Sequence, residues 1–384
     1  MKYDILVIGA GIAGASLAYE LVARNGSSRP RVALLEAEDT PGYHSTGRSV
    51  ALYSECYGHR VVRMLSKASR SFFASPPAGF ADHPLMTPRG VLFLARKDQK
   101  AVAERLYEET RALARRLELV DAPRARELNP VLDPEYVHCC VYEPDAMDLD
   151  VNAVHQGYLR GAKAGGVALI TGARVQALDR TATEWRVETS AGTFSAERVV
   201  DAAGAWADEV AEHAGTRALG LVALRRTVIA FDPPAGSASD AWPMTIDSEE
   251  QFYIKPEAGR LLGSPADETP VPPSDVQPEE LDIAHAVDRI ERATTLRVRA
   301  LTRKWAGLRN FFADKLPAVG PDASAASFFW LAGQGGYGIM TAPAMARVAA
   351  AHVLGENMPD ELTDLGFEAS ALLPARLVPD EKRA

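Results

Sequence analysis

The stretch Asp4-Ile5-Leu6-Val7-Ile8-Gly9-Ala10-Gly11-Ile12-Ala13-Gly14 decides the fold class of this 384-residue chain. Residues 5–8 are apolar and mostly β-branched, which is typical of a buried parallel strand. Apolar residues then recur at helical spacing over 12–22, and a second apolar strand over 31–35 ends at Glu36. A strand, a glycine-rich turn, a helix and a second strand closed by an acid predict a dinucleotide-binding βαβ unit.

Each residue of this pattern has a physical task. Gly9 lets the chain turn off the strand, Gly11 lets backbone N–H groups approach a pyrophosphate, and Gly14 lets the helix pack closely on the strands. The helix N-terminus offers free N–H groups and the positive end of its dipole to the phosphates. Glu36 is placed to accept hydrogen bonds from the adenosine ribose.

Two later segments favour FAD over NAD as the dinucleotide. A second apolar strand, 198–203, ends in Gly204-Ala205-Trp206, where the chain is expected to return to the nucleotide. Near the C-terminus, an apolar strand over 328–332 precedes the glycine-rich segment 333–338, which opens a helix over 339–353. A second helix N-terminus would stabilise negative charge on a reduced flavin, and NAD does not need it.

Composition excludes several classes of protein. A net charge of −9 argues against nucleic acid as a partner, because phosphate binding needs a basic face. The sequence contains no apolar run of 18 residues, so no transmembrane segment is expected. It shows no signal peptide and has only three cysteines, which favours a reducing compartment. We expect a cytoplasmic protein and leave peripheral contact with the inner membrane open.

A family resemblance covers almost the whole chain and rests on strings more specific than the glycine fingerprint. They lie at 41–49 (PGYHSTGRS), 76–80 (PPAGF), 155–160 (HQGYLR), 202–206 (AAGAW), 262–266 (LGSPA), 305–309 (WAGLR) and 334–339 (QGGYGI). On these strings the chain resembles the D-amino-acid oxidase superfamily of FAD enzymes, and within it most closely the bacterial D-arginine dehydrogenases. The resemblance implies noncovalent FAD, because the C-terminal glycine segment lacks the cysteine that anchors the flavin in covalent relatives.

The resemblance also implies the architecture. We expect an α/β fold with a Rossmann-like FAD-binding domain and a smaller substrate domain that combines a mixed β-sheet with helices. The FAD-binding domain would be discontinuous, formed by residues 1–80, 150–217 and 316–384. Residues 81–149 and 218–315 would form the substrate-binding domain.

The predicted cofactor contacts combine the fingerprint with positions that match the family. In chain order they are Gly9, Gly11, Ile12, Ala13, Gly14, Glu36, Ala37, His44, Ser45, Thr46, Arg48, Ser49, Val175, Ala203, Gly204, Gly335, Gly336, Tyr337, Gly338 and Ile339. No metal site is expected, because the spacing in His138-Cys139-Cys140 does not suit zinc.

The predicted substrate site is built around an arginine in an apolar setting. Arg309 needs an anion there, and its planar fork matches a carboxylate. The family resemblance implies that Arg309 and Arg226 bind the substrate α-carboxylate, and that Tyr253 and Tyr57 bind it or close over the substrate. The remaining pocket positions implied by the family are Val91, Leu52, Met244, Ile246, Gly307 and Gly336.

Two of these positions depart from the D-arginine dehydrogenases. Val91 stands where those enzymes have a glutamate that pairs with the substrate guanidinium, and Leu52 stands where they have a histidine. A guanidinium would lose its counter-ion in such a pocket, at a cost of roughly several kcal/mol. The sequence therefore predicts an apolar side-chain pocket, with Glu55 and Asp247 as alternative sources of an acid.

The predicted function is an FAD-dependent D-amino-acid dehydrogenase or oxidase. A hydride would pass from Cα of an apolar D-α-amino acid to flavin N5, giving an imino acid that hydrolyses to a 2-oxo acid and ammonia. A secondary amine such as an N-methyl amino acid, glycine or a 2-hydroxy acid is the alternative substrate. A flavin-binding redox partner without turnover is the alternative of another class. The sequence does not identify the electron acceptor, for which quinone and oxygen both remain open.

Overall fold

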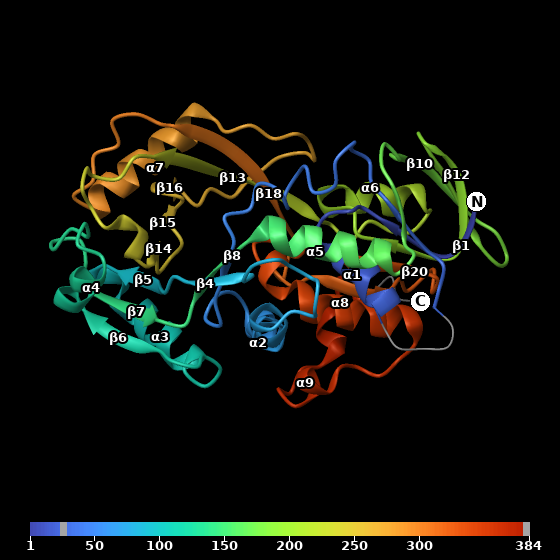
Figure 1. Cartoon of the computed structure of the whole chain (residues 1–384), viewed down its shortest axis with the longest axis horizontal. Helices are drawn as coiled ribbons and strands as arrows, with labels where there is room; N and C mark the ends of the chain where they lie inside the picture. The colour runs from blue at the N-terminus through green and yellow to red at the C-terminus, as the bar shows by residue number, and fades with distance from the viewer. Residues whose placement is uncertain (24–28, 379–384) are drawn as a thin grey trace.

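The structure, a computed structural model, describes residues 1–23 and 29–378. Residues 379–384 of the predicted FAD-binding domain lie outside the described residues. Two large sheets lie toward opposite ends of the long axis, with a group of helices beside the first (Figure 1). This is the predicted α/β class with a mixed sheet, while the domain boundaries themselves stay a prediction.

The first sheet has eight strands and carries the βαβ unit at its centre. Its strands are β1 (Lys2–Ile8), β2 (Val32–Leu35), β9 (Ala168–Ile170), β10 (Val175–Arg180), β11 (Trp185–Thr189), β12 (Gly192–Asp201), β19 (Ala318–Pro321) and β20 (Phe328–Ala332). Strand β1 pairs in parallel with β2 on one side and β12 on the other, and β12 pairs in parallel with β20. Their carboxyl ends therefore meet at one edge, where α/β sheets bind ligands.

Alternation along β1 builds the two faces of this sheet. Ile5 and Val7 belong to a core shared with helices on one face, whereas Leu6 and Ile8 belong to a core on the other. The helices of this half are α1 (Ile12–Ala23), α2 (Arg60–Ala74), α5 (Val151–Ala164), α6 (Ala207–His213), α8 (Gly338–Leu354) and α9 (Asp360–Thr363). Helix α1 packs between α5 and α8, and α2 packs on α8 (Figure 1).

The second sheet has nine strands and is mixed, because β5 and β14 run parallel within antiparallel neighbours. Its strands are β5 (Val91–Ala95), β6 (Glu118–Asp121), β7 (Cys139–Glu143), β13 (Val222–Phe231), β14 (Met244–Asp247), β15 (Tyr253–Glu257), β16 (Arg260–Ser264), β17 (Thr269–Pro270) and β18 (Arg303–Phe311). Helices α3 (Lys100–Thr110), α4 (Ala122–Leu128) and α7 (Glu280–Ala293) pack against it.

A third, small sheet contains β3 (Leu52–Tyr53), β4 (Met86–Pro88) and β8 (Met147–Leu149). Strand β3 follows the cofactor-loop string at 41–49, and its partner β8 lies four residues after β7. The segment from 44 to 57 thus runs from the first sheet to the second. This path brings cofactor-loop residues and substrate-pocket residues to a shared cavity.

Candidate functional site

The turn between β1 and α1 is shaped for a close backbone approach. Gly9 has φ +98°, and a Cβ on it would lie 2.4 Å from the carbonyl oxygen of Ala202. A Cβ on Gly14 would lie 1.9 Å from the carbonyl oxygen of Gly9, so only glycine lets α1 pack here. The backbone N–H of Ile12, at the helix N-terminus, donates to Thr46 Oγ1 at 3.0 Å. The N-terminus of α1 and a hydroxyl therefore meet where a phosphate is expected.

A narrow cavity beside this turn, here called the nucleotide cavity, has the Glu36 carboxylate in its wall. Glu36 Oε2 accepts from Ala10 N–H and Oε1 from Glu38 N–H, both at 3.0 Å. Each oxygen keeps a free acceptor position, which a ribose hydroxyl would fill. The predicted cofactor residues in this wall are Gly9, Gly11, Glu36, Ala37, His44, Ser45, Thr46, Val175, Ala203 and Gly204.

His44 and Trp206 form one side of the nucleotide cavity. The His44 ring lies 4.6 Å from the Trp206 ring, centroid to centroid, and its Nε2 lies 3.0 Å from Glu38 Oε1. Trp206 was quoted in the sequence pattern but not assigned to the cofactor, and the structure places it here. The two rings are tilted by 51° to each other, so each offers its own aromatic face to a planar ligand such as adenine.

A second, larger cavity, here called the reaction cavity, is lined by residues of both halves of the molecule. It shares Gly11, Ser45, Thr46, Ala202 and Gly204 with the nucleotide cavity, so the two are continuous. A long ligand with phosphates in its middle fits this shape. The predicted cofactor residues in its wall are Gly11, Ile12, Ala13, Ser45, Thr46, Arg48, Ser49, Gly204, Gly335, Gly336, Gly338 and Ile339.

Two predicted cofactor residues lie behind the walls. Gly14 serves the packing of α1, and Tyr337 packs its ring 5.3 Å from Tyr57 and 5.9 Å from Phe311. Arg48 lines the reaction cavity, but its guanidinium donates to the carbonyl oxygens of Val276 and Ala306. Arg48 therefore ties the cavity wall to the loop that follows β17.

The two predicted arginines converge on the reaction cavity from neighbouring strands. In the β13–β18 pairing Arg226 lies opposite Gly307, and Arg309 opposite Leu224, so the arginines are diagonal neighbours on one face. Arg226 is 5% exposed, and burial together with the Arg309 charge lowers its pKa. Within the described residues, Arg226 Nε is buried without a hydrogen-bond partner. Arg226 Nη2 is paired with Glu268 at 3.3 Å, so the unused Nε of Arg226 beside the Arg309 charge is what favours an anion here.

Gly336 leaves room for this pair of charges. A Cβ on Gly336 would lie 2.9 Å from Arg309 Cζ, so a side chain there would push the guanidinium away. Arg309 donates to the hydroxyl of Tyr57 at 3.1 Å, and Tyr253 lies in the same wall. The structure thus brings together all four residues predicted to hold a carboxylate.

Glu250 also lines the reaction cavity, and the sequence analysis missed it. The Tyr57 hydroxyl donates to Glu250 Oε2 at 3.1 Å, and Glu250 itself has φ +56°, a strained conformation for a residue with a side chain. Its signal in the sequence is the polar run 247–251 directly after strand residue Ile246. Because Ile246 lines the cavity, the polar loop that directly follows it lies close enough to contribute a side chain to the same wall.

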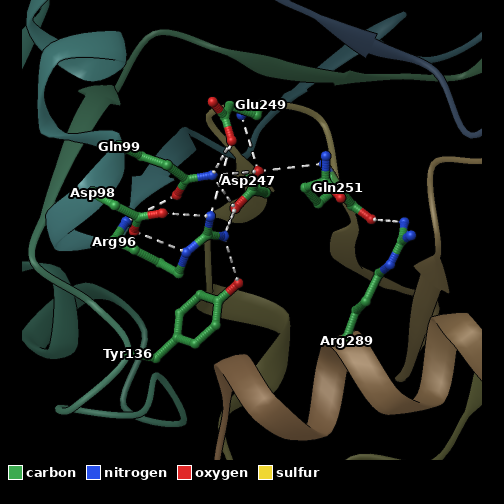
Figure 2. A network of polar contacts seen from close by, with 8 residues as sticks. All are labelled: Arg96, Asp98, Gln99, Tyr136, Asp247, Glu249, Gln251 and Arg289. Atoms are coloured by element: carbon green, nitrogen blue, oxygen red, sulfur yellow. Dashed lines mark hydrogen bonds and ion pairs between the residues drawn. The ribbon is translucent and has the colours of Figure 1, made fainter.

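A buried polar network holds the loop that carries Glu250 (Figure 2). Asp247 accepts from Gln99 Nε2 at 3.1 Å and from the backbone N–H groups of Glu249 and Gln251 at 2.9 and 3.3 Å. Arg96 lies 3.5 Å from Asp247, and Arg289 donates to the Gln251 carbonyl at 2.6 Å. Asp247 is fully buried in this network and is no source of an acid for the reaction cavity.

Val91, a predicted pocket residue, lies outside the wall of the reaction cavity. It is fully buried but does not line the reaction cavity, where Phe93 stands in its place two residues along β5. Val91 lies between Met244 and Glu143 in the strand pairing, and the apolar cluster that contains it covers it completely. Glu55 is also buried, bonded to Tyr53 and paired with Arg70. The apolar wall consists of Leu52, Phe93, Met244, Ile246 and Val228.

Glu143 is a buried acid that the sequence did not reveal. It lies opposite Val91 on β7, is 2% exposed, and accepts from Ser54 Oγ at 2.5 Å and Glu55 N–H at 2.8 Å. Burial, with a smaller effect of the Glu55 charge, raises the pKa of Glu143 to about 7. Ser54, its donor, lines the reaction cavity.

The raised pKa of Glu143 predicts that the free energy of unfolding depends on pH. The folded protein keeps a proton on Glu143 that the unfolded chain releases near pH 4.5, so the free energy of unfolding should fall as pH rises from about 4.5 to about 7. The fall expected from this group is about 3 kcal/mol. Urea unfolding of wild type and Glu143→Gln across this range isolates it, because all other groups titrate in both proteins. Parallel curves would contradict the assignment.

Comparisons with known proteins find relatives over most of the chain. A family model described as FAD dependent oxidoreductase matches residues 4–352. Dimethylglycine dehydrogenase of Rattus norvegicus is 25% identical over 391 residues, which cover 95% of this chain and 44% of that protein. This chain thus spans less than half the length of the dimethylglycine dehydrogenases that it matches. Glycine oxidase of Geobacillus kaustophilus is 24% identical over 375 residues, covering 91% of this chain and 92% of that protein.

Solved structures show the same fold. L-proline dehydrogenase from P. horikoshii has a TM-score of 0.84 and 22% identity, and covers 98% of this chain and 97% of its own. Glycine oxidase from Geobacillus kaustophilus has a TM-score of 0.83 and 20% identity, with 98% and 100% covered. These proteins share the fold class predicted from the sequence. The comparisons do not single out the D-arginine dehydrogenases.

Proposed function

Because the chain belongs to the family of FAD-dependent oxidoreductases, we propose that it oxidises the carbon–nitrogen bond of a small amino acid, specifically an apolar D-α-amino acid. FAD is its cofactor, and the continuous pair of cavities fits that cofactor's length. The observation that carries the proposal is the convergence of Arg226 and Arg309 on the reaction cavity. Among the described residues, a buried donor of Arg226 has no partner and lies beside the Arg309 charge, which favours a carboxylate there.

The residues of the cavity would position the substrate. Arg226 and Arg309 hold its carboxylate, Tyr253 and Tyr57 close around it, and the apolar wall takes the side chain. The same two positive charges favour the neutral amine over the ammonium form, so no separate base is needed. When bound, FAD supplies the acceptor for the hydride of Cα. The resulting imino acid reacts with water to give a 2-oxo acid and ammonia.

The rest of the cofactor assignment follows the cavity walls. Residues 9–14 would hold the pyrophosphate, Glu36 the ribose, and the α8 N-terminus at Gly338 the flavin end. The flavin is expected to be noncovalent. Among the described residues, no cysteine lines either cavity. The electron acceptor, quinone or oxygen, is not assigned. In the described part of the chain, no helix has the length and apolar character needed to cross a bilayer.

A second candidate substrate class is a secondary amine or glycine. The relatives named above support it, since they are a dimethylglycine dehydrogenase and a glycine oxidase. Arg226 and Arg309 would bind the carboxylate of these substrates equally well, and also that of a 2-hydroxy acid. The size and apolar character of the wall formed by Leu52, Phe93 and Met244 favour a substrate with a side chain.

Anaerobic flavin reduction separates these candidates. D-Leucine, D-methionine and D-phenylalanine should bleach the flavin faster than D-arginine, because each buried CH₂ contributes about 0.8 kcal/mol and an unpaired guanidinium is penalised. Glycine, sarcosine, dimethylglycine and 2-hydroxy acids complete the panel, with L-amino acids as the stereochemical control. Faster reduction by sarcosine or glycine would favour the second class. No reduction by any member would leave a flavin-binding redox partner.

A further inference from the structure

We propose that Ser54, backed by the buried side chain of Glu143, forms a polar subsite in the apolar wall of the reaction cavity and binds a hydrogen-bond donor at the tip of the substrate side chain. The inference rests on the proposed function, since it takes the substrate carboxylate to lie at Arg226 and Arg309. It changes the expected substrate from purely apolar to apolar with one polar end.

The register of the second sheet places the acid beside the pocket. Glu143 on β7 lies opposite Val91 on β5, and Val91 lies beside Met244 on β14. Residues directly across from one another share a face of a sheet, so Glu143 faces the side that carries the apolar wall. The segment after β3 covers it, and Ser54 in that segment lines the cavity.

Hydrogen bonding fixes what Ser54 offers to the cavity. Above about pH 7, where Glu143 is ionised, the one hydroxyl proton of Ser54 is donated to Glu143 Oε2 at 2.5 Å. In the part of the chain that the structure describes, Cys56 N–H is the donor to Ser54 Oγ, at 3.1 Å. A hydroxyl oxygen accepts two hydrogen bonds, so one acceptor position remains open. While Glu143 is ionised, Ser54 Oγ can therefore accept a hydrogen bond from a ligand, and its own proton stays in the bond to Glu143.

Glu143 acts through Ser54 as a positioning residue. Its second oxygen is held by Glu55 N–H at 2.8 Å, which fixes the carboxyl and with it the direction of the Ser54 proton. Its buried position also makes the subsite electronegative when the carboxyl is ionised. The chemical class that fits is an apolar stem ending in a hydroxyl or an ammonium group. A methyl end would leave the acceptor without a partner.

The test uses carboxylates without an α-amino group, which the proposed reaction does not consume. Each alkanoate is compared with the ω-hydroxy acid of equal heavy-atom count, from pentanoate with 4-hydroxybutanoate to heptanoate with 6-hydroxyhexanoate. Binding is followed by the change in the visible spectrum of the flavin in the holoenzyme, at a pH above about 7, where Glu143 is ionised. For each length, the dissociation constant of the alkanoate is divided by that of its matched hydroxy acid. At the one length that reaches Ser54, this ratio should shift to about tenfold its value at the other lengths.

Matched serine variants decide whether Ser54 is responsible. Ser54→Ala should abolish the shift, because it removes the acceptor that only the hydroxy acid can use. Ser66→Ala is the control, because Ser66 is a buried helix serine bonded to the Val62 carbonyl and lies outside the cavity wall. It should keep the shift. A shift that persists in Ser54→Ala, or no shift at any length in wild type, would overturn the subsite.

Glu143→Gln tests the contribution of the acid with a different ligand. Binding of 5-aminopentanoate, which has an ammonium end, should weaken about tenfold in this variant, while hydroxy-acid binding changes by less than about threefold. Equal loss for both ligands would overturn the positioning role. If no carboxylate perturbs the flavin of the wild type, the anchor at Arg226 and Arg309 fails, and the subsite falls with it. If the carboxylates bind but no hydroxy acid is preferred over its matched alkanoate, the subsite is overturned and the anchor stands.

Discussion

Arg309→Met should lower kcat/KM by about 10²-fold or more while the protein still folds and retains FAD. A charged hydrogen bond to a carboxylate contributes roughly 1.5–3 kcal/mol, and a misplaced Cα adds to the loss. The change also removes the donor to the Tyr57 hydroxyl, which Arg309 contacts at 3.1 Å. Methionine keeps much of the side-chain volume, so the β13–β18 pairing should persist.

The matched control is Arg303→Met on the same strand. Arg303 is exposed, and its guanidinium lies 5.3 Å from the centre of the Trp305 ring, outside the reaction cavity. The kcat/KM of Arg303→Met should stay within about twofold of wild type, since surface substitutions rarely change stability by more than ~0.5 kcal/mol. The measurement is steady-state kinetics with the fastest substrate of the anaerobic panel, alongside flavin content and melting temperature. An Arg309→Met enzyme of normal efficiency would remove the anchor role.

Gly14→Ala should weaken FAD binding by about 10²-fold and also destabilise the apoprotein. The new Cβ would lie 1.9 Å from the Gly9 carbonyl oxygen, and neither backbone can move without shifting α1 from β1. Overpacking of this kind costs roughly 1–3 kcal/mol. The N–H groups at the start of α1 would then no longer face the phosphates.

Gly11→Ala separates cofactor contact from packing. Its Cβ would meet only the Thr46 side-chain oxygen, at 3.1 Å, but it would project into both cavities. The apoprotein should melt near the wild-type temperature, while FAD affinity falls about tenfold or more. Fluorescence titration with FAD and thermal unfolding of both apoproteins give the two quantities. A Gly14→Ala apoprotein as stable as wild type would show that the helix tolerates the added methyl.

The cofactor end of the site could be predicted from sequence because its signals are local. The turn between β1 and α1, the acid Glu36 and the glycines before α8 each lie within one strand–turn–helix unit. Spacing alone then places glycine backbone and helix N-termini beside the ligand. The arginines needed the family resemblance, because nothing near Arg226 in the sequence indicates that Arg309 lies diagonally across a strand pair.

The rest of the substrate end depended on sheet register. Alternation along β5 does not tell whether Val91 or Phe93 reaches the cavity, since both lie on the same face of the strand. Glu143 meets Ser54 only because β7 pairs with β5, and the two residues are far apart in the chain. Glu250 enters through a loop whose shape comes from the Asp247 network. Such contacts between distant residues have no signature within one segment.

The reaction cavity takes its walls from both ends of the sequence, with Gly11 on one side and Gly335 on the other. During synthesis the ribosome makes every strand of both large sheets before it reaches the glycine segment that opens α8. The flavin end of the site can therefore form only after every strand of both large sheets has been made. FAD that meets the chain earlier finds only the nucleotide cavity, whose walls come from residues 8–213.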